Sequence, residues 1–383
     1  MPRAGDRIKP LRFLITGGGT GGHIYPALAV AGGLRDRHPE AEIIYVGTDR
    51  GLEAKLVPKA GFEFYAVPAQ GLKRQLNLAN LLVPWRAGKG YLMSRRLIRQ
   101  FAPHVVVGTG GYVCGPVVMA ASRQGIPTFI HEQNALPGLT NRLLSRFADR
   151  TAVTFVDAVK QFPPKARVIL TGLPVRPEIL QADRKTARKT LSIGESEQVL
   201  LSFGGSQGAH SINKALIATI QHYAFQKGTR LFHASGPKGY SELLDDLAAR
   251  GLNIEAIPNV TIASYFYEIA DLLAAADLVV CRAGASTLAE ITVLGCPSIL
   301  IPYPFATANH QEHNAQALAR RGAAVAVRDS ELDEGRLHET IVELLSNPHK
   351  LAALGRASRE MGKPRALDNI LDVVERLAGG QTR

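Results

Sequence analysis

Two glycine-rich segments, each directly after a short apolar run, constrain this chain more than any other feature. The first, GGGTGGH at residues 17–23, follows the apolar residues 13–15, and the second, GGSQGA at residues 204–209, follows 199–201. A strand that turns through glycines into a helix exposes backbone N–H groups and the positive end of the helix dipole, which suits phosphate groups. One such loop in each half predicts two α/β domains and a phosphorylated ligand.

Short apolar runs alternate with helical patterns in both halves. Continuous apolar runs such as 105–107 are typical of buried parallel strands. The alternation predicts an α/β chain with doubly wound parallel sheets, and Pro26 is expected in the first turn of a helix, where proline is tolerated. The expected strands are 12–16, 42–46, 62–67, 104–108, 127–131, 151–154, 199–203, 230–234, 254–257, 278–281, 298–301 and 324–327.

The length of 383 residues exceeds one ordinary hydrophobic core and predicts two domains. The join is expected at residues 171–177, TGLPVRP, whose glycine and prolines suit a hinge. We therefore predict one domain over 1–172 and another over 173–363. A final helix within 364–383 is expected to pack back on the first domain.

A net charge of +12 indicates an anionic partner or a solvated basic surface. The segment 72–99 concentrates seven Lys and Arg residues with no acidic residue, interleaved with leucines, Tyr91 and the only tryptophan, Trp85. Such a segment suits an anionic membrane surface, and it equally suits a helix whose apolar face packs on its own sheet. No apolar run reaches the ~18 residues that span a bilayer.

Targeting and redox signals favour a cytoplasmic protein. We expect no signal peptide, because the glycine segment 17–19 interrupts the first apolar stretch. Cys114, Cys281 and Cys296 are too scattered to predict a disulfide framework or a zinc site.

The first glycine loop also supports a different class of protein. Gly17, Gly19 and Gly22 satisfy the dinucleotide-binding pattern, and Asp49 follows the second expected strand, where a ribose partner would lie. This favours a nicotinamide- or flavin-dependent oxidoreductase. The second glycine loop weakens that interpretation, because a simple dehydrogenase has no need of it.

Polar side chains follow two expected strands of the first half. His23, at the first turn after the glycine loop, could act as a general base, contact a phosphate or only cap the helix. Residues 131–134, HEQN, lie at the carboxyl end of a strand, which faces the ligand crevice of a parallel sheet. There Glu132 could accept a proton and Asn134 could bind a sugar, or the four side chains could only pack the loop.

Two further segments follow strands of the second half. In 281–290, CRAGASTLAE, Glu290 could bind a ribose or could cap a helix together with Thr287. In 309–314, NHQEHN, His310 and His313 lack a clear third metal ligand, so we prefer sugar recognition by Gln311 with His310 as its neighbour. No metal site is predicted.

Taken in order, five motifs resemble the MurG family of bacterial N-acetylglucosaminyltransferases over nearly the whole chain. They are GGTGGH at 18–23, GGY at 110–112, HEQN at 131–134, GGSQG at 204–208 and CRAG at 281–284. The resemblance implies a GT-B fold, in which two Rossmann-like domains face a deep cleft. The first domain then serves the acceptor and the membrane, and the second binds UDP-N-acetylglucosamine (UDP-GlcNAc).

The resemblance also implies the substrates, the place of action and the site residues. The acceptor is lipid I, undecaprenyl-diphosphate-MurNAc-pentapeptide, and the product is lipid II of peptidoglycan synthesis. The enzyme is then peripheral on the cytoplasmic face of the bacterial inner membrane, attached near segment 72–99. It implies no cofactor and no nucleic acid. The UDP-GlcNAc-binding residues it implies are Thr20, Gly21, Gly22, Asn134, Arg176, Ser206, Phe266, Ala285, Ser286, Thr287, Leu288, Ala289, Glu290 and Gln311. Among them Thr20, Gly21 and Gly22 belong to a loop that lines the donor or acceptor site, and Phe266 acts through its backbone.

One departure from the family pattern lies in the join, where Leu173 replaces a common asparagine while Arg176 remains. The expected reaction is attack of the muramoyl 4-hydroxyl on C1 of GlcNAc with inversion and release of UDP. His23 is the first choice for the base and Glu132 the second. The alternatives are another UDP-sugar transferase of the same fold, the oxidoreductase, and a nucleotide-sugar binding protein without catalysis.

Overall fold

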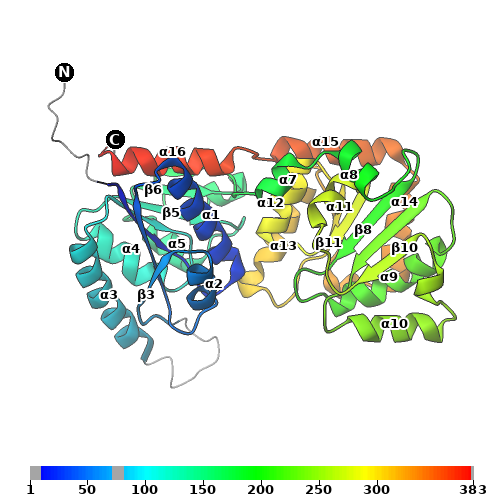
Figure 1. Cartoon of the computed structure of the whole chain (residues 1–383), viewed down its shortest axis with the longest axis horizontal. Coiled ribbons are helices and arrows are strands. Elements are labelled where there is room, and N and C mark those ends of the chain that lie inside the picture. Colours follow the sequence, from blue (N-terminus) through cyan, green and yellow to red (C-terminus); the bar gives the residue numbers. More distant parts are fainter. Residues whose placement is uncertain (1–9, 71–81, 381–383) are drawn as a thin grey trace. The chain divides into compact units, whose positions relative to one another are not determined.

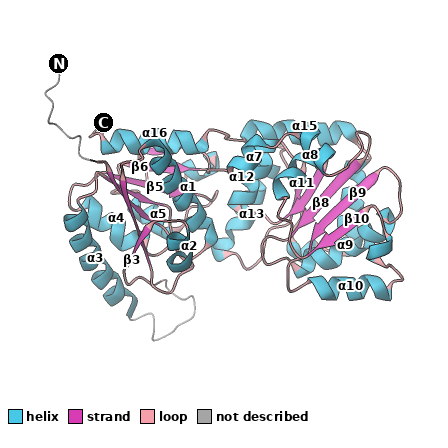
Figure 2. Cartoon of the chain, in the orientation of Figure 1, coloured by secondary structure: helices cyan, strands magenta, loops and turns pink. Residues whose placement is uncertain are grey.

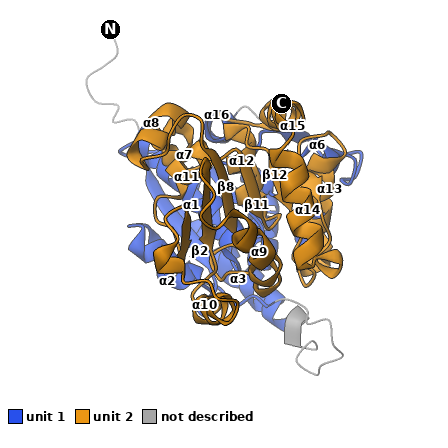
Figure 3. Cartoon of the chain, turned by 90° about the vertical axis from the view of Figure 1, so that its right-hand side faces the viewer, with its two compact units in different colours: residues 1–174, 365–383 blue, residues 175–364 orange. Residues whose placement is uncertain are grey.

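The computed structural model describes residues 10–70 and 82–380. The chain divides into two compact units, residues 1–174 together with 365–383, and residues 175–364 (Figure 3). The division falls two residues after the predicted boundary at 172. The last helix belongs to the first unit, and the elements of both units can be traced in Figure 1.

The first unit is built on a seven-stranded parallel sheet of order β3-β2-β1-β4-β5-β6-β7. Its strands are β1 Arg12–Thr16, β2 Glu42–Gly47, β3 Glu63–Ala66, β4 Val105–Gly108, β5 Thr128–Glu132, β6 Arg150–Val153 and β7 Val168–Leu170. Its helices are α1 Gly21–Arg37, α2 Glu53–Lys59, α3 Leu82–Phe101, α4 Cys114–Ser122, α5 Leu139–Leu144, α6 Val156–Val159 and α16 Ala366–Ala378.

The second unit is built on a six-stranded parallel sheet of order β10-β9-β8-β11-β12-β13. Its strands β8, β9 and β10 are labelled in Figure 2. Its strands are β8 Gln198–Phe203, β9 Thr229–Ala234, β10 Val260–Ala263, β11 Leu278–Cys281, β12 Ser298–Leu300 and β13 Val325–Ala326. Its α-helices are α7 Pro177–Gln181, α8 Arg184–Thr190, α9 His210–Tyr223, α10 Tyr240–Ala249, α11 Ile269–Ala275, α12 Ala285–Leu294, α13 His310–Ala319, α14 Glu334–Leu345 and α15 Pro348–Met361. Short 3₁₀ turns are η2 Ile254–Ala256, η3 Thr307–Asn309 and η4 Asp329–Glu331.

These sheets confirm the predicted fold class of two Rossmann-like, doubly wound units. Each strand order reverses once, between β1 and β4 in the first unit and between β8 and β11 in the second. At such a reversal, the loops that follow the carboxyl ends of the strands form a crevice. Ligands of α/β proteins bind in this crevice. The two glycine loops follow β1 and β8, so each lies at the reversal of its own sheet.

Two strand predictions need correction. The edge strand β7 was not expected from the sequence, and the strand expected at 254–257 is instead the 3₁₀ turn η2, with β10 beginning at Val260. The Asn253 side chain accepts the Glu255 N–H (3.2 Å), which turns the backbone at that point. The Asn259 amide then donates to three carbonyls, among them that of Tyr223 (2.7 Å), and fixes the start of β10.

The predicted position of Pro26 is also wrong. Helix α1 begins at Gly21, inside the glycine loop, so Pro26 lies within the helix and not in its first turn. Proline has no N–H to donate to the carbonyl four residues earlier, here that of Gly22. The consequence is local, because this carbonyl belongs to the first turn of the helix.

The last helix completes the core of the first unit. The side chains of Ile370, Leu371 and Val374 on α16 are buried together with Val30 and Leu34 of α1. At the rim, one guanidinium at the end of α1 contacts three carboxylates of α16: Arg37 lies 2.8 Å from Asp368, 2.7 Å from Asp372 and 3.1 Å from Glu375. These contacts combine apolar burial with an ion-pair network at one helix pair.

Candidate functional site

The first glycine loop is held against the loop that follows β4. The Gly18 N–H donates to the Gly110 carbonyl (3.3 Å). A Cβ on Gly111 would lie 2.3 Å from the Gly18 oxygen, and Gly111 has a φ of +83°, so only glycine fits there. The predicted motifs at 17–23 and 110–112 are therefore one structural unit at the sheet reversal.

His23 stands over this loop with a defined ring. Its Nδ1 lies 3.0 Å from the Gly18 carbonyl oxygen and 3.4 Å from the Thr20 hydroxyl. Because a carbonyl oxygen only accepts, Nδ1 carries the proton of the neutral ring and Nε2 is the basic atom. The Thr109 hydroxyl donates to the His23 carbonyl (2.8 Å) and fixes the backbone below the ring. This geometry suits a general base.

The three residues before His23 form the start of α1. Thr20 is the N-cap residue, with an extended backbone and no side-chain cap hydrogen bond, and Gly21 and Gly22 open the helix. Thr20 and Gly22 are exposed and Gly21 is half-buried. The first N–H groups of a helix point away from its body, so these residues present donors at the carboxyl edge of the sheet.

The segment 131–134 does not turn all four side chains toward a ligand, which corrects the sequence interpretation. His131, Glu132 and Gln133 are each at most 2% exposed. His131 donates from Nε2 to the Gly172 carbonyl (2.8 Å) and accepts at Nδ1 from Gln133 (3.1 Å). Burial lowers the pKa of His131, so its ring is neutral. Most of this motif packs the loop.

Glu132 is fully engaged as a hydrogen-bond acceptor. One carboxylate oxygen accepts from the backbone and side-chain N–H groups of Asn134 (3.0 and 3.2 Å). The other accepts from the Gly138 N–H (3.0 Å) and the Asn141 amide (2.9 Å). A carboxylate that holds four donors is poorly placed to collect a proton. Asn134 remains half-buried at the edge of this cluster.

The second glycine loop rests on the backbone that follows β9. A Cβ on Gly208 would lie 2.1 Å from the Ser235 oxygen, and one on Gly236 would lie 2.4 Å from the Gly208 Cα. The loop therefore packs main chain against main chain, and helix α9 begins directly after it, with no acidic residue in its first turn. Ser206 is exposed at the tip of the loop.

A neutral network lies beneath this second loop. The Asn213 amide of α9 donates to the Ser235 carbonyl (3.0 Å), and its oxygen lies 3.1 Å from His233 Nε2. His233 is fully buried, and burial lowers its pKa to about 4. The support of the second loop is thus uncharged at neutral pH.

Helix α12 carries the segment 285–290, and its geometry excludes one of the two roles considered for Glu290. The N-cap of α12 is Gly284, so Glu290 lies in the second turn and the predicted capping box with Thr287 is wrong. Glu290 instead accepts from Arg176 Nε (2.8 Å) at the start of α7. Burial raises the pKa of Glu290, and the Arg176 hydrogen bond opposes that shift.

Other residues of this segment differ in what they can offer. Ser286 is exposed, and Ala285, Thr287 and Ala289 are half-buried. Leu288 is 1% exposed and its N–H donates to the Gly284 carbonyl (3.0 Å), so it packs beneath the segment. Helix α12 therefore presents small side chains and its first N–H groups at the sheet reversal.

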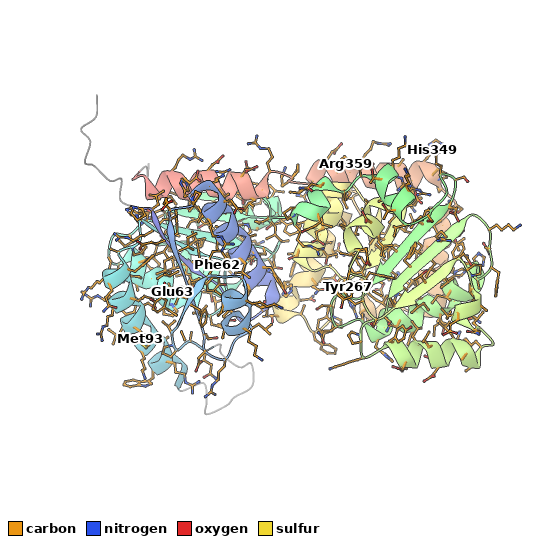
Figure 4. The ribbon with its side chains drawn as sticks, in the orientation of Figure 1. Phe62, Glu63, Met93, Tyr267, His349 and Arg359 are labelled. Atoms are coloured by element: carbon orange, nitrogen blue, oxygen red, sulfur yellow. The ribbon has the colours of Figure 1, made fainter. Side chains whose placement is uncertain are left out.

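Phe266 lies in the loop after β10, at the same carboxyl edge of the second sheet. Its ring is half-buried and meets the Phe232 ring edge to face at a centroid distance of 6.2 Å. Tyr267, labelled in Figure 4, is 86% exposed. With its ring anchored inward, Phe266 suits a contact made through its backbone.

Gln311 lies in the first turn of α13, beyond a strained turn. Ala308 and Asn309 both have positive φ angles, 52° and 54°, which non-glycine residues rarely adopt. The Gln311 amide oxygen accepts the Tyr303 N–H (2.9 Å), and His310 Nδ1 lies 2.8 Å from the Thr307 carbonyl. Among the described residues, no group of three or more His, Cys, Asp or Glu is placed to hold a metal ion.

A partly buried hydrogen-bond network in the second unit could not be predicted from the sequence. The Arg282 guanidinium pairs with Asp329, and it donates to the Ser211 hydroxyl (2.9 Å) and the Ile301 carbonyl (3.2 Å). It thus joins the ends of β11 and β12 to the first turn of α9. Arg282 stood in a recognised motif, whereas Asp329 and Ser211 carried no signal of their own.

Helix α3 covers residues 82–99 of the predicted segment 72–99, and it has a buried face and an exposed face. Residues 71–81 lie outside the described residues, so the part of the segment up to 81 is not placed. Ile98 and Ser94 are buried, and α3 packs on α4. On the outside, Trp85 is 74% exposed and Leu92 62%, and Met93 is labelled on this helix in Figure 4. Of the helices in the described ranges, none has the length and apolar character to cross a membrane.

Comparison with known proteins matches both halves of the chain to one glycosyltransferase family. Residues 13–153 match the glycosyltransferase family 28 N-terminal domain, and residues 199–370 match the C-terminal domain of that family. The chain is 59% identical over 373 residues to the UDP-N-acetylglucosamine–N-acetylmuramyl-(pentapeptide) pyrophosphoryl-undecaprenol N-acetylglucosamine transferase of Desulforudis audaxviator, covering 97% of this chain and 100% of the relative. The protein with the same name from Desulforamulus reducens is 53% identical, covering 96% and 99%.

The chain belongs to the MurG family. The crystal structure of Acinetobacter baumannii MurG matches it with a TM-score of 0.79 and 29% identity, covering 96% of this chain and 100% of that one. The chain is therefore a glycosyltransferase, and the nicotinamide-dependent oxidoreductase considered from the first glycine loop is not supported. Asp49, the ribose partner in that alternative, follows β2 at the surface.

Membership of the MurG family does not show what each site residue does, so the individual roles remain predictions. The structure gathers Thr20, Gly21, Gly22, His23, Glu132 and Asn134 at the carboxyl edge of the first sheet. At the carboxyl edge of the second sheet lie Ser206, Phe266, the segment 285–290 with Arg176, and Gln311. Each set lies at the reversal of its own sheet or on strands near it.

Proposed function

We propose that this chain transfers N-acetylglucosamine from UDP-GlcNAc to the muramoyl 4-hydroxyl of undecaprenyl-diphosphate-MurNAc-pentapeptide, converting lipid I to lipid II. The observation that carries the proposal is the 59% identity over 97% of the chain to a relative whose name states this donor and acceptor. The first unit has a positioned imidazole, and the second unit has a glycine loop at a helix start; a transfer from a nucleotide sugar needs both kinds of group.

The second unit holds the proposed UDP site, while Asn134 of the first unit is proposed to contact the GlcNAc and Thr20, Gly21 and Gly22 to line the donor or acceptor site. The N–H groups of the loop at 204–208 and the start of α9 would bind the diphosphate, with Ser206 as a side-chain contact. Glu290 would accept the ribose hydroxyls, the Phe266 backbone would contact uracil, and Gln311 would bind the sugar. The leaving UDP carries negative charge, which oriented N–H groups stabilise without reorganisation. The proposed reaction therefore needs no metal or other cofactor.

The proposed base is His23. The bond between the acceptor O4 and C1 of GlcNAc forms while the bond between C1 and the UDP oxygen breaks, and the anomeric centre inverts. The acceptor proton passes to His23 Nε2, because Nδ1 donates to the Gly18 carbonyl at 3.0 Å. Glu132 is the weaker choice, since its carboxylate already accepts four hydrogen bonds.

The membrane surface is the proposed place of action, on its cytoplasmic side. Trp85, Leu92 and Met93 extend outward from α3, and exposed Arg and Lys residues share the helix. Helix α5 packs on α4 as α3 does, and it adds the exposed side chains of Leu139 and Leu143. Apolar area with neighbouring cations suits the headgroup region of an anionic bilayer. The proposal includes no nucleic acid partner.

The test is a transfer assay with radiolabelled UDP-GlcNAc and a lipid I analogue. One labelled GlcNAc should reach the acceptor for each UDP released, with inversion at C1 and inhibition by free UDP. UDP binding without transfer would instead indicate a nucleotide-sugar binding protein, and transfer to other acceptors but not to the analogue would indicate another UDP-sugar transferase.

A further inference from the structure

A buried carboxylate lies directly beneath the first glycine loop. Glu53, the first residue of α2, is 0% exposed. One of its oxygens accepts the Gly19 N–H (3.1 Å), and the other accepts the Thr48 N–H (3.1 Å) and the Thr48 hydroxyl (2.7 Å). Among the described residues, no Lys, Arg or His pairs with it. Oriented N–H and O–H dipoles alone hold this charge.

Three glycines make room for this carboxylate. A Cβ on Gly18 would lie 2.4 Å from a Glu53 oxygen, one on Gly51 would lie 2.1 Å from the other oxygen, and one on Gly47 would lie 2.5 Å from its Cγ. These glycines come from three places: the first loop, the end of β2 and the turn before α2. The chain thus forms a fitted cradle for the Glu53 side chain, and an unpaired buried charge would be unfavourable without it.

The carboxylate is connected to His23 through two neighbouring residues of the loop. Glu53 fixes Gly19 by its N–H, and the preceding carbonyl, that of Gly18, accepts the proton on His23 Nδ1 at 3.0 Å. Moving Gly19 would rotate the peptide plane between the two glycines and displace that carbonyl. The ring would then lose the contact that fixes its tautomer and orientation.

We propose that Glu53 is a positioning residue for the transfer reaction, holding the first glycine loop so that His23 presents Nε2 as the base. The inference rests on the proposed function. Glu53 also occupies the Gly19 N–H as an internal anion, which leaves the donor diphosphate to the second loop. Glu53 touches neither substrate and acts through the loop.

The test compares Glu53→Gln with Glu40→Gln in the full chain. A glutamine has one acceptor oxygen, so its NH₂ group must face the N–H of either Gly19 or Thr48. We expect kcat to fall about 10- to 100-fold while the KM for UDP-GlcNAc stays within about twofold, because the base is misplaced while the UDP contacts proposed for the second unit are untouched. Glu40 is exposed on the same unit, and its variant should keep kcat within about twofold.

The pH profile separates positioning from mere structural support. In Glu53→Gln the protonated ring of His23 loses the nearby negative charge and the fixed Gly18 carbonyl, so its pKa should fall. The acidic limb of the pH profile of kcat/KM should therefore move to lower pH. A folded Glu53→Gln with an unshifted limb or with wild-type kcat would overturn the proposal. If Glu53→Gln does not fold, Thr48→Val removes one donor and keeps the charge. It should lower kcat several-fold, and an unchanged kcat would overturn the proposal.

Histidine nitrogen NMR gives a readout independent of turnover. In ¹⁵N-histidine protein, with the His23 signals assigned from His23→Ala, neutral His23 should carry its proton on Nδ1, and Glu53→Gln should add the Nε2–H tautomer. An Nε2–H tautomer in the wild type, or no change in the variant, would overturn the role of Glu53. Absence of transfer by the wild type, with the expected tautomers present, would instead reject the proposed function alone.

Discussion

The glycine loops of the two units follow the same strand–turn–helix path but rest on different supports. The first is held by the Glu53 carboxylate below it and by the Gly110 carbonyl beside it. The second is held by the backbone at Ser235 and by the neutral pair of His233 and Asn213. In the described part of the chain, no carboxylate accepts from the N–H groups of residues 204–208.

This difference separates two tasks that the loop sequences alone do not distinguish. A loop that already donates to an internal carboxylate is less suited to a second anion, and its negative support favours a histidine that must take up a proton. A loop with a neutral support keeps its N–H groups for a diphosphate. We therefore assign proton transfer to the first loop and diphosphate binding to the second.

The largest expected effect is the loss of the base. His23→Ala should lower kcat by about a thousandfold, roughly 4 kcal/mol of barrier, because the carboxylate of Glu132, the other candidate base, already accepts four hydrogen bonds and is poorly placed to take the acceptor proton. The dissociation constant for UDP should change less than about twofold. Steady-state assays and calorimetric titration with UDP measure the two quantities, and an unchanged kcat would remove His23 from this role.

The neutral support of the second loop predicts a dependence of stability on pH. The pKa of His233 is about 4 in the folded chain, against an ordinary 6.5 when unfolded. The unfolded chain therefore binds the proton first, so the free energy of unfolding should fall by about 3 kcal/mol between pH 6.5 and pH 4. Urea unfolding followed by circular dichroism should show this part of the loss in the wild type and not in His233→Gln.

A matched control accompanies that experiment. His349, labelled in Figure 4, is exposed on α15, and His349→Gln should keep the wild-type pH dependence. If His233→Gln loses stability on acidification as steeply as the wild type does, the neutral network beneath the second loop is not what titrates.

Donor affinity should depend on the backbone contact of the second loop. In Gly208→Ala the new Cβ would lie 2.1 Å from the Ser235 oxygen, so the loop must move. We expect UDP to bind about 30-fold more weakly, equivalent to about 2 kcal/mol of charge-assisted hydrogen bonding. Gly228→Ala has similar backbone strain, φ +81°, with nothing within 4 Å, and should leave the affinity unchanged. Equal losses in both variants would attribute the effect to strain alone.

The corresponding change in the first loop should affect turnover and not affinity. In Gly111→Ala the new Cβ would lie 2.3 Å from the Gly18 oxygen, which accepts from His23. A displaced imidazole should lower kcat about tenfold with UDP affinity unchanged. Gly125→Ala, with φ +73° and open space around it, is the control. Weaker UDP binding by Gly111→Ala would contradict the division of tasks.

The sequence predicted most of the fold because buried parallel strands carry continuous apolar runs. Val105–Gly108 and Leu278–Cys281 were recognised in this way. The strand at Val168–Leu170 was missed because it is a short, half-exposed edge strand. The 254–257 segment has apolar ends that resemble a strand, but a side-chain hydrogen bond from Asn253 turns it, and periodicity carries no trace of that bond.

The site was predicted less completely, because the sequence gives residue types and not their partners. His23 and the glycine loops were recognisable from their place after strands. Glu132 looked like a base until four donors were found on its carboxylate. Glu53 gave no signal, since a glutamate at a helix start ordinarily faces solvent. The structure shows that it is buried, with three glycines packed around it.

Calorimetric titration of UDP into Glu53→Gln and Gly208→Ala tests the division between the loops most directly. We predict that Glu53→Gln binds UDP within about twofold of the wild type, whereas Gly208→Ala binds it at least about tenfold more weakly. If the Glu53 variant weakens UDP binding as much as the Gly208 variant does, both loops hold the nucleotide and the central claim is contradicted.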